Sequence, residues 1–351
     1  MSKTVLTLLA IGCFTVGTLQ ARTPPVDESN NPTASYTFTQ DAPAPDEALT
    51  LWYRKPATKW ETEALPVGNG PLAAMVFGGI NTERIQFNEE TVWDGVPQNT
   101  NNPEALAALP EVRRLLFENK NDEATKLAKD KMMGKPYRIK SYQTLGDLMF
   151  DFPDTDTVAG YRRDLDLTTA IAKVQYQVAG VNYTREVFVT APDRAIVVNL
   201  KADQPGQINF TAHLQRDKAT VEAGSRNRLI LRGQLTGIKY EAQLLPMVSG
   251  GSVTTQDGKL DVSKADEVTL LLVGATSYNN AKDISGNATA RCEKALWAAA
   301  EKSYSQLRGA HLADYQSLFS RVKLDLGSTD AVKKPTDERL RAVKRGAFDP
   351  Q

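Results

Sequence analysis

Cysteine and histidine are scarce in this sequence, which has two of each among 351 residues. Cys13 lies in an apolar segment near the amino terminus. A mature chain without that segment would keep only Cys292 and could form no intramolecular disulfide. We expect Cys292 to be a small buried residue on a helix. His213 and His311 fall in different predicted elements, so spacing assembles no cluster of metal ligands.

The sequence also lacks net charge, because 42 lysine and arginine residues balance 42 aspartate and glutamate residues. No basic field is present to attract nucleic acid or an anionic membrane surface, and we expect neither as a partner. With 41% hydrophobic and 24% charged residues, the composition is ordinary for a soluble globular protein.

The amino terminus has the pattern of a processing signal. Lys3 is followed by a mostly apolar run from Val5 to Leu19, which is too short for a stable membrane span. We predict a signal peptide over residues 1–21, cleavage near Ala21, and export to the periplasm or the extracellular space. A lipid anchor at Cys13 is the less favoured alternative, because the apolar run continues past it.

Short apolar segments separated by glycine and proline dominate the chain after a polar linker predicted over residues 22–48. Alternation over 173–178, the Ala179-Gly180 turn and alternation over 181–189 indicate a β-hairpin. Many such strands with few helices between them favour a mainly β fold. We predict a large antiparallel β-sandwich domain over residues 49–279.

Helical periodicity interrupts the strands at residues 103–133 and predicts a small helical insertion. Asn102 before Pro103 has the pattern of an N-cap and first turn, and a second short helix is expected from Asp122 to Met133. The first helix should bury one apolar face, which consists of Leu106, Leu109, Val112 and Leu116.

A second helical region is predicted after the sandwich, as an α-helical linker over residues 280–327. Apolar residues at steps of three or four from Leu296 to Val322 indicate one long helix, or two helices that break near Gly309. Leu324 to Gly327 has the pattern of a closing strand and turn. The charged segment 328–351 is interpreted as the lead-in to a further domain.

The segment from Leu65 to Gly95 contains the most informative local pattern. Leu72 to Phe77 is apolar at nearly every position and is predicted to be covered on both faces. Arg84 to Asn88 alternates, so one face should point to the core. Polar and aromatic groups then gather where this strand ends. They are the candidates for a substrate rim or a domain interface: Asn88, Glu89, Glu90, Trp93 and Asp94.

None of these candidates forms a catalytic set. Glycoside hydrolysis needs two groups that flank one bond, whereas neighbours such as Glu89 and Glu90 on an extended segment point to opposite faces. We therefore expect structural or interface roles for both. Gly68 to Ala73 formally matches a dinucleotide fingerprint, but no βαβ pattern surrounds it, so a tight turn is the better interpretation and no cofactor is predicted.

Several long motifs occur in one order along the chain: LPVGNGPLAAMVFGG, ERIQFNEETVWDGVPQN, YRRDLDLTTAIAKVQYQVAGVNYTREVFVTAPDRAIVV and HLADYQSLFSRVKLDLG. With these motifs, the sequence resembles the amino-terminal domain of glycoside hydrolase family 95, the α-L-fucosidases and α-L-galactosidases. The resemblance covers about residues 49 to 351. It implies an amino-terminal β-sandwich, a helical linker, an (α/α)6 barrel and a further β domain.

The resemblance also implies an activity. Members of this family cleave by inversion: a barrel glutamate protonates the leaving oxygen, and an asparagine polarised by an aspartate activates water. The chain matches only the sandwich and the linker, so no catalytic residue is expected in it. A fucosylated glycan is the expected substrate and the barrel the expected intramolecular partner. The alternatives are α-L-galactosidase specificity, a stand-alone carbohydrate-binding module, or a scaffold without a ligand.

Overall fold

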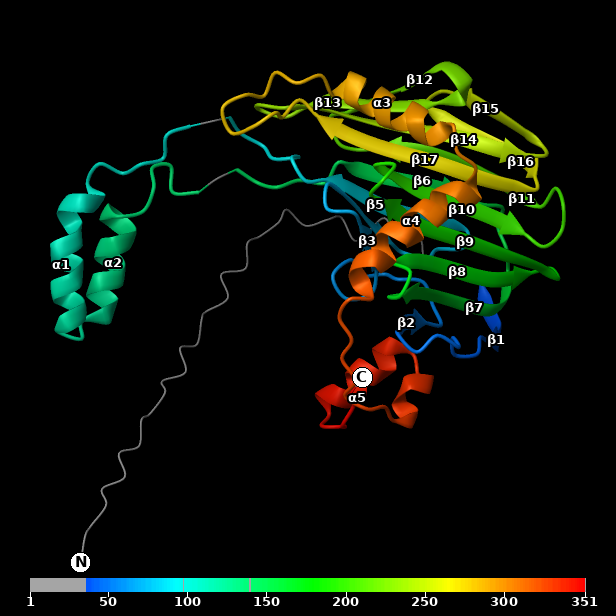
Figure 1. The fold of residues 1–351 in the computed structure, drawn as a ribbon, viewed down its shortest axis with the longest axis horizontal. Helices are drawn as coiled ribbons and strands as arrows, with labels where there is room; N and C mark the ends of the chain where they lie inside the picture. The colour runs from blue at the N-terminus through cyan, green and yellow to red at the C-terminus, as the bar shows by residue number, and fades with distance from the viewer. Residues whose placement is uncertain (1–35, 97, 139, 351) are drawn as a thin grey trace, which may run out of the picture. The chain divides into compact units, whose positions relative to one another are not determined.

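The computed structural model describes residues 36–96, 98–138 and 140–350 (Figure 1). The predicted signal peptide and the first part of the predicted linker lie outside the described residues. In the described part, 17 strands form two β-sheets that share one apolar core. The prediction of a mainly β sandwich is confirmed.

The larger sheet has ten strands and the smaller sheet seven. The large sheet contains, in spatial order, β1 (Thr37–Asp41), β7 (Thr157–Asp166), β8 (Ile171–Val178), β9 (Val181–Thr190), β10 (Ala195–Ala202), β17 (Glu267–Thr276), β14 (Lys239–Ser249), β13 (Leu229–Gln234) and β12 (Thr220–Ala223), with β2 (Thr50–Tyr53) also on β7. The small sheet contains β15 (Ser252–Gln256), β16 (Lys259–Ala265), β11 (Ile208–Gln215), β6 (Gly146–Asp151), β5 (Thr82–Glu89), β4 (Leu72–Val76) and β3 (Leu65–Gly68).

Strand alternation builds the core between the sheets. Ile208, Phe210 and Leu214 on β11 face inward and pack with residues such as Val198 and Leu200 on β10. Burying a large apolar side chain contributes about 1.5–3 kcal/mol, so this layer is the main source of stability. The predicted hairpin is present: β8 and β9 are joined by Ala179-Gly180, both at positive φ, as a tight hairpin turn requires.

Two expectations about strands were wrong. Leu72, Ala74 and Val76 of β4 are buried, but Ala73 is exposed and Met75 is only half-buried, so the strand is covered on one face. Small and flexible apolar side chains made its outer face look like core. The structure also places β1 inside the segment predicted to be a linker. β1 pairs in parallel with β7, and its Phe38 ring contacts Tyr161.

The helical insertion forms α1 (Ala105–Phe117) and α2 (Asn121–Lys131), which pack together through a cluster that includes Val112 and Leu115. The predicted face was wrong in part, since Leu106, Leu109 and Leu116 are exposed. Asn102 is not the N-cap residue. Its amide instead donates to the carbonyls of Lys131 and Met133 and joins the two helices.

Helices α3 (Ala288–Ala300) and α4 (Tyr304–Phe319) cover the outer face of the large sheet (Figure 1). Cys292 is buried on α3 beneath β14, as predicted. The helices break at Ser303 and not near Gly309. Ser303 forms a capping box with Gln306, whereas nothing lies within 4 Å of a side chain added at Gly309.

After α4 the chain forms a short 3-10 turn (Asp330–Lys333) and α5 (Thr336–Lys344). A second 3-10 turn, Ser225–Asn227, precedes β13. The strand expected at Leu324 to Gly327 is not present, because these residues pair with no sheet edge. α5 contacts β2, where the Trp52 backbone N–H donates to the Thr336 hydroxyl at 2.9 Å. Among the described residues, no helix is both long and apolar enough to cross a membrane.

Candidate functional site

The predicted rim lies where β5 leaves the small sheet. Asn88 and Glu89 are its last residues and pair with Ala73 and Leu72 of β4. Glu89 is half-buried, and its carboxylate accepts hydrogen bonds from the Thr91 N–H at 2.8 Å and the Thr91 hydroxyl at 2.6 Å. Burial, helped by the charge of Glu90, raises the pKa of Glu89, while the bonds from Thr91 oppose this rise.

The two carboxylates of this rim lie in different surroundings. Glu90 is exposed, and its backbone N–H donates to the Pro71 carbonyl at 2.9 Å. Glu89 is engaged in fixing the turn through Thr91, whose hydroxyl also bonds that of Thr276 on β17. This arrangement connects the end of the small sheet to the end of the large sheet. Glu89 therefore has a structural role.

Trp93 forms an exposed aromatic pair with Tyr142. Their ring centroids lie 5.0 Å apart at an interplanar angle of 40°, and an isolated β-bridge joins the two residues. The buried Val92 anchors the loop, since its carbonyl accepts from the Gln143 N–H. The pair offers apolar ring surface on which a sugar or another domain could pack. Tyr142 was missed because the helical insertion separates it from Trp93 in sequence.

Asp94 holds a third loop against this end of the sandwich. Its carboxylate accepts from the Thr236 N–H at 2.9 Å, and hydrogen bonds from Thr236 lower its pKa. Gly237 lies so close to Gly95 that an added Cβ would be 1.9 Å from the Gly95 carbonyl oxygen. The backbone approach therefore requires glycine. The structure thus brings all five predicted site residues to one end of the sandwich, where the carboxylates of Glu89 and Asp94 hold loops in place.

Glu241 is a buried carboxylate that the sequence patterns did not reveal. It lies on β14 and accepts from Arg232 Nε at 2.7 Å and from the Thr289 hydroxyl at 2.5 Å. Gln243 donates to its other oxygen. Since these partners come from β13, β14 and α3, Glu241 links α3 to the large sheet, and its carboxylate is not available to a substrate.

The histidines form no metal centre. His311 on α4 bonds the Thr169 carbonyl through Nε2 at 2.8 Å, and burial lowers its pKa, so it is a neutral packing residue. His213 lies on β11. No group of three or more potential metal ligands occurs in the part of the chain that the structure describes.

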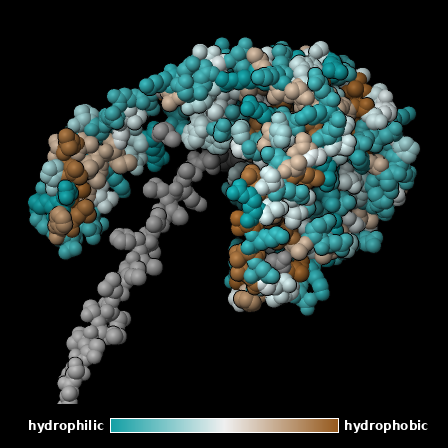
Figure 2. Space-filling model, in the orientation of Figure 1, coloured by the Kyte–Doolittle hydropathy of each residue, from teal (hydrophilic) through white to brown (hydrophobic). Residues whose placement is uncertain are grey.

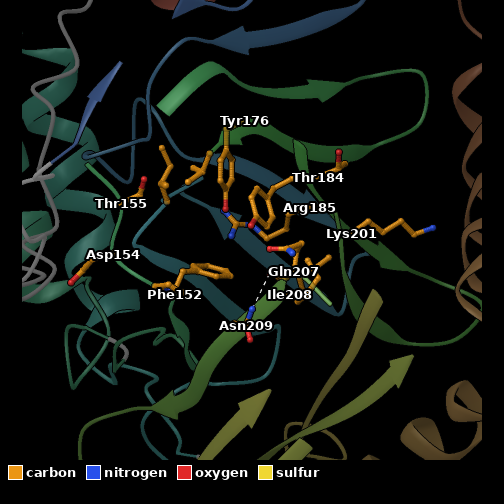
Figure 3. Close-up of a pocket in the computed structure, with 15 residues that line it drawn as sticks. Phe152, Asp154, Thr155, Tyr176, Thr184, Arg185, Lys201, Gln207, Ile208 and Asn209 are labelled. Carbon is orange, nitrogen blue, oxygen red and sulfur yellow. Dashed lines mark hydrogen bonds between the residues drawn. The ribbon is translucent and has the colours of Figure 1, made fainter. Parts of the chain in front are cut away.

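A cavity of about 280 Å³ lies at the other end of the sandwich, between the two sheets (Figure 3). Its walls come from β8, β9 and β10 of the large sheet and from β11 and the loop after β6 of the small sheet. Tyr176 and Phe152 point into the same space, whereas Lys201 points away from it (Figure 3). Because its residues are spread over 80–209, no sequence motif indicated this cavity.

A buried ion pair supports one wall of the cavity. Arg185 on β9 contacts the Glu83 carboxylate at 2.6 Å, and the two side chains are 3% and 0% exposed. The same Arg185 nitrogen donates to the Gly79 carbonyl at 2.7 Å, and the Gly78 N–H donates to Glu83. Burial raises the pKa of Glu83, and the positive charge of Arg185 opposes that rise.

Comparison with known proteins places these features in a family. Residues 51–281 match the family described as glycosyl hydrolase family 65, N-terminal domain. Residues 303–351, which include α4 and α5, match the glycosyl hydrolase family 95 catalytic domain.

Curated relatives are similar along most of the chain. "Alpha-L-fucosidase 2" of Arabidopsis thaliana is 35% identical over 84% of this chain. Two proteins named "Probable alpha-fucosidase A", from Aspergillus niger and Aspergillus oryzae, are 30% and 25% identical over 84% and 80% of it. The chain spans only 39% to 42% of the length of these relatives. This chain therefore belongs to the family of glycosyl hydrolase family 65 N-terminal domains, and its domain is of the kind that precedes a glycosyl hydrolase family 95 catalytic domain.

Proposed function

We propose that this chain is the amino-terminal sandwich and linker of an exported glycoside hydrolase that removes terminal α-L-fucose from glycans by inverting hydrolysis. In this proposal the proton donor and the group that activates water lie in the catalytic domain whose match begins at residue 303. The α-fucosidase names of the relatives support the reaction class. The use of the Glu89 and Asp94 carboxylates in holding loops agrees with catalytic residues elsewhere.

The observation that carries the proposal is the exposure of apolar side chains in the segment that matches the catalytic domain. Figure 2 shows hydrophobic residues at the surface of this carboxyl-terminal segment. The exposed side chains are Leu318, Val322, Leu324, Leu326, Leu340, Val343 and Phe348. Exposed apolar groups in such number are typical of a surface that another domain covers. We infer that the rest of the catalytic domain packs on them.

The rim residues take a supporting role in this proposal. The Trp93–Tyr142 pair and the exposed Glu90 lie on loops that three connections hold in place. A rigid loop of this kind can contribute to the edge of a substrate cleft or to a domain interface. Glu89 then stabilises the loop and does not transfer protons.

The assay that tests the proposal is hydrolysis by the full-length protein of α-L-fucosides and α-L-galactosides, followed by proton NMR of the released sugar. We expect turnover of the fucoside and initial release of the β-anomer, because inversion of an α-linkage gives that product. Preference for the galactoside would favour the alternative specificity. Turnover of neither substrate would contradict the enzyme proposal and leave a carbohydrate-binding or scaffold role.

A further inference from the structure

We propose that the cavity between the sheets binds one neutral sugar ring, so that the sandwich itself holds a glycan. This site lies away from the rim at Asn88 to Asp94. β5 has eight residues and runs from the cavity end at Thr82 to the rim end at Glu89, a length of about 25 Å at the usual rise of a strand. The inference goes beyond the proposed hydrolysis and does not depend on it.

One wall of the cavity is aromatic. Tyr183 stacks on Tyr176 with ring centroids 5.4 Å apart, and Tyr176 in turn stacks on Tyr161 at 6.5 Å. Phe152 lies across the cavity (Figure 3). Because neighbouring rings cover both faces of Tyr176, no slot is open between parallel rings for a planar heterocycle. The Phe152 ring is also occupied, by Phe150 and by the Arg185 guanidinium over its face. The outer face of Tyr183 can instead receive the C–H face of a pyranose.

The cavity wall also contains a buried hydrogen-bond donor without a partner. Arg185 lines the cavity, its side chain is 3% exposed, and its Nε makes no hydrogen bond. This Nε has almost no surface that a water-sized oxygen can reach, so a ligand hydroxyl bonds it only when the Arg185 side chain shifts towards the cavity. Because a buried donor left unpaired is costly, such a shift would favour a hydroxylated ligand over a hydrocarbon.

Further polar groups at the cavity can serve other hydroxyls. Gln207 extends into the same space and carries both a donor and an acceptor (Figure 3). Burial raises the pKa of Tyr176 to about 12, so its phenol stays protonated at neutral pH. Asp154 is exposed at the edge of the cavity and offers acceptor oxygens. Mixed donors and acceptors beside rings are suited to a polyhydroxylated ligand.

The charges at the cavity select a neutral ligand. Arg185 is compensated by Glu83, and Lys201 pairs with Glu267 at 3.1 Å while pointing away from the cavity. A carboxylate or phosphate would therefore find no free positive charge. The size sets a further limit. A cavity of about 280 Å³ lies just below the usual range of about 300–1,000 Å³ for small-molecule sites, which fits a single ring.

The test is fluorine NMR of the full-length protein labelled with fluorotyrosine, with the Tyr183 resonance assigned by its loss in Tyr183→Phe. We expect titration with L-fucose, L-galactose or D-galactose to shift this resonance, while D-glucuronic acid leaves it unchanged. The resonance of Tyr137, an exposed tyrosine outside the cavity, is the control and should stay in place. Crystals soaked in the sugar that binds most tightly should show it against Phe152 and Arg185.

A matched pair of variants completes the test. Because Tyr183→Ala lacks the Tyr183 resonance, binding to the variants is followed at the Tyr176 resonance, whose ring also lines the cavity. Tyr183→Ala should weaken binding of that sugar at least about tenfold, the effect of losing one stacking contact, whereas Tyr137→Ala should leave it unchanged. An unmoved Tyr183 resonance with an empty cavity in soaked crystals would overturn the proposal. So would a larger response to the charged sugar or to a nucleobase. Both results are independent of hydrolysis, so failure here leaves the fucosidase proposal to its own assay.

Discussion

The Glu83–Arg185 ion pair joins the two sheets at the cavity end of the sandwich. Both side chains are buried, and they connect β5 of the small sheet to β9 of the large sheet. Removing one partner from such a pair leaves an uncompensated charge away from water. The pair therefore carries a large penalty when it is broken, whatever its net contribution when intact.

We predict that Arg185→Met destabilises the protein by about 3–5 kcal/mol, as measured by denaturant unfolding, and that adding Glu83→Gln restores part of the loss. Without Arg185, burial should raise the pKa of Glu83 further above its ordinary 4.5. The stability linked to this carboxyl is fully present below its ordinary pKa of 4.5 and is lost as pH rises through the raised pKa of the folded state. Arg113→Met, at an exposed position of α1, is the control. Equal stability losses for both methionine variants would contradict this account.

Replacing Trp93 tests the role of the rim, and Trp60 provides a closely matched control. Trp93 and Trp60 are each 42% exposed, so truncation should affect folding about equally. Under the proposed function, we predict that Trp93→Ala lowers kcat/KM of the full-length protein about tenfold, because a rim or interface contact is lost, whereas Trp60→Ala does not. Steady-state kinetics on the preferred glycoside measures both. If the two variants behave alike, Trp93 has no role at the substrate or the interface.

At the scale of elements, a local capping motif and not glycine content decides where the carboxyl-terminal helices separate. Gly309 lies inside α4 without breaking it, while the Ser303 capping box starts that helix. A glycine costs about 1 kcal/mol relative to alanine in a helix interior, which is too little to end a helix that packs on a sheet. Buried Leu307 and His311 supply that packing.

Two substitutions in this region should act in opposite directions. Ser303→Ala should lower stability by about 1 kcal/mol through loss of the cap. Gly309→Ala should raise it by about 0.5–1 kcal/mol, because an added methyl group meets only open space. Thermal unfolding of the two variants beside the parent measures both shifts. A destabilising Gly309→Ala would show that the packing of α4 differs from the one described.

The sequence predicted elements well where side-chain periodicity reflects burial and less well where it does not. The alternation of β8 and β9 follows the core, and these strands were anticipated. Leu324 and Leu326 also alternate, yet they pair with no strand of the two described sheets. Alternation reports which residues are apolar, and it cannot report whether a partner strand exists.

The candidate site was predictable only where its residues are close in sequence. Asn88 to Asp94 are the end of β5 and the loop that follows it, so their gathering followed from the end of a single strand. The Tyr142 partner of Trp93 and the cavity around Arg185 depend on strand order, which brings distant segments together. Local patterns contain no information on that order.

At the scale of the whole molecule, the described chain combines a buried apolar core with a surface segment whose apolar side chains are exposed. The sandwich buries its apolar residues between two sheets and beneath α3 and α4. The segment after α4 exposes apolar side chains such as Leu324, at 79%, and Phe348, at 80%. We propose that the rest of a catalytic domain covers this segment, since it matches the family 95 catalytic domain.

The most direct test of this central claim is the intact mass of the mature protein from its native source, captured with an antibody raised against residues 49–325. The account predicts a product well above the 38.5 kDa of this chain, with its amino terminus just after Ala21. A product that ends at Gln351 would contradict it. The apolar segment would then need another partner, and the enzyme proposal would give way to a sugar-binding module.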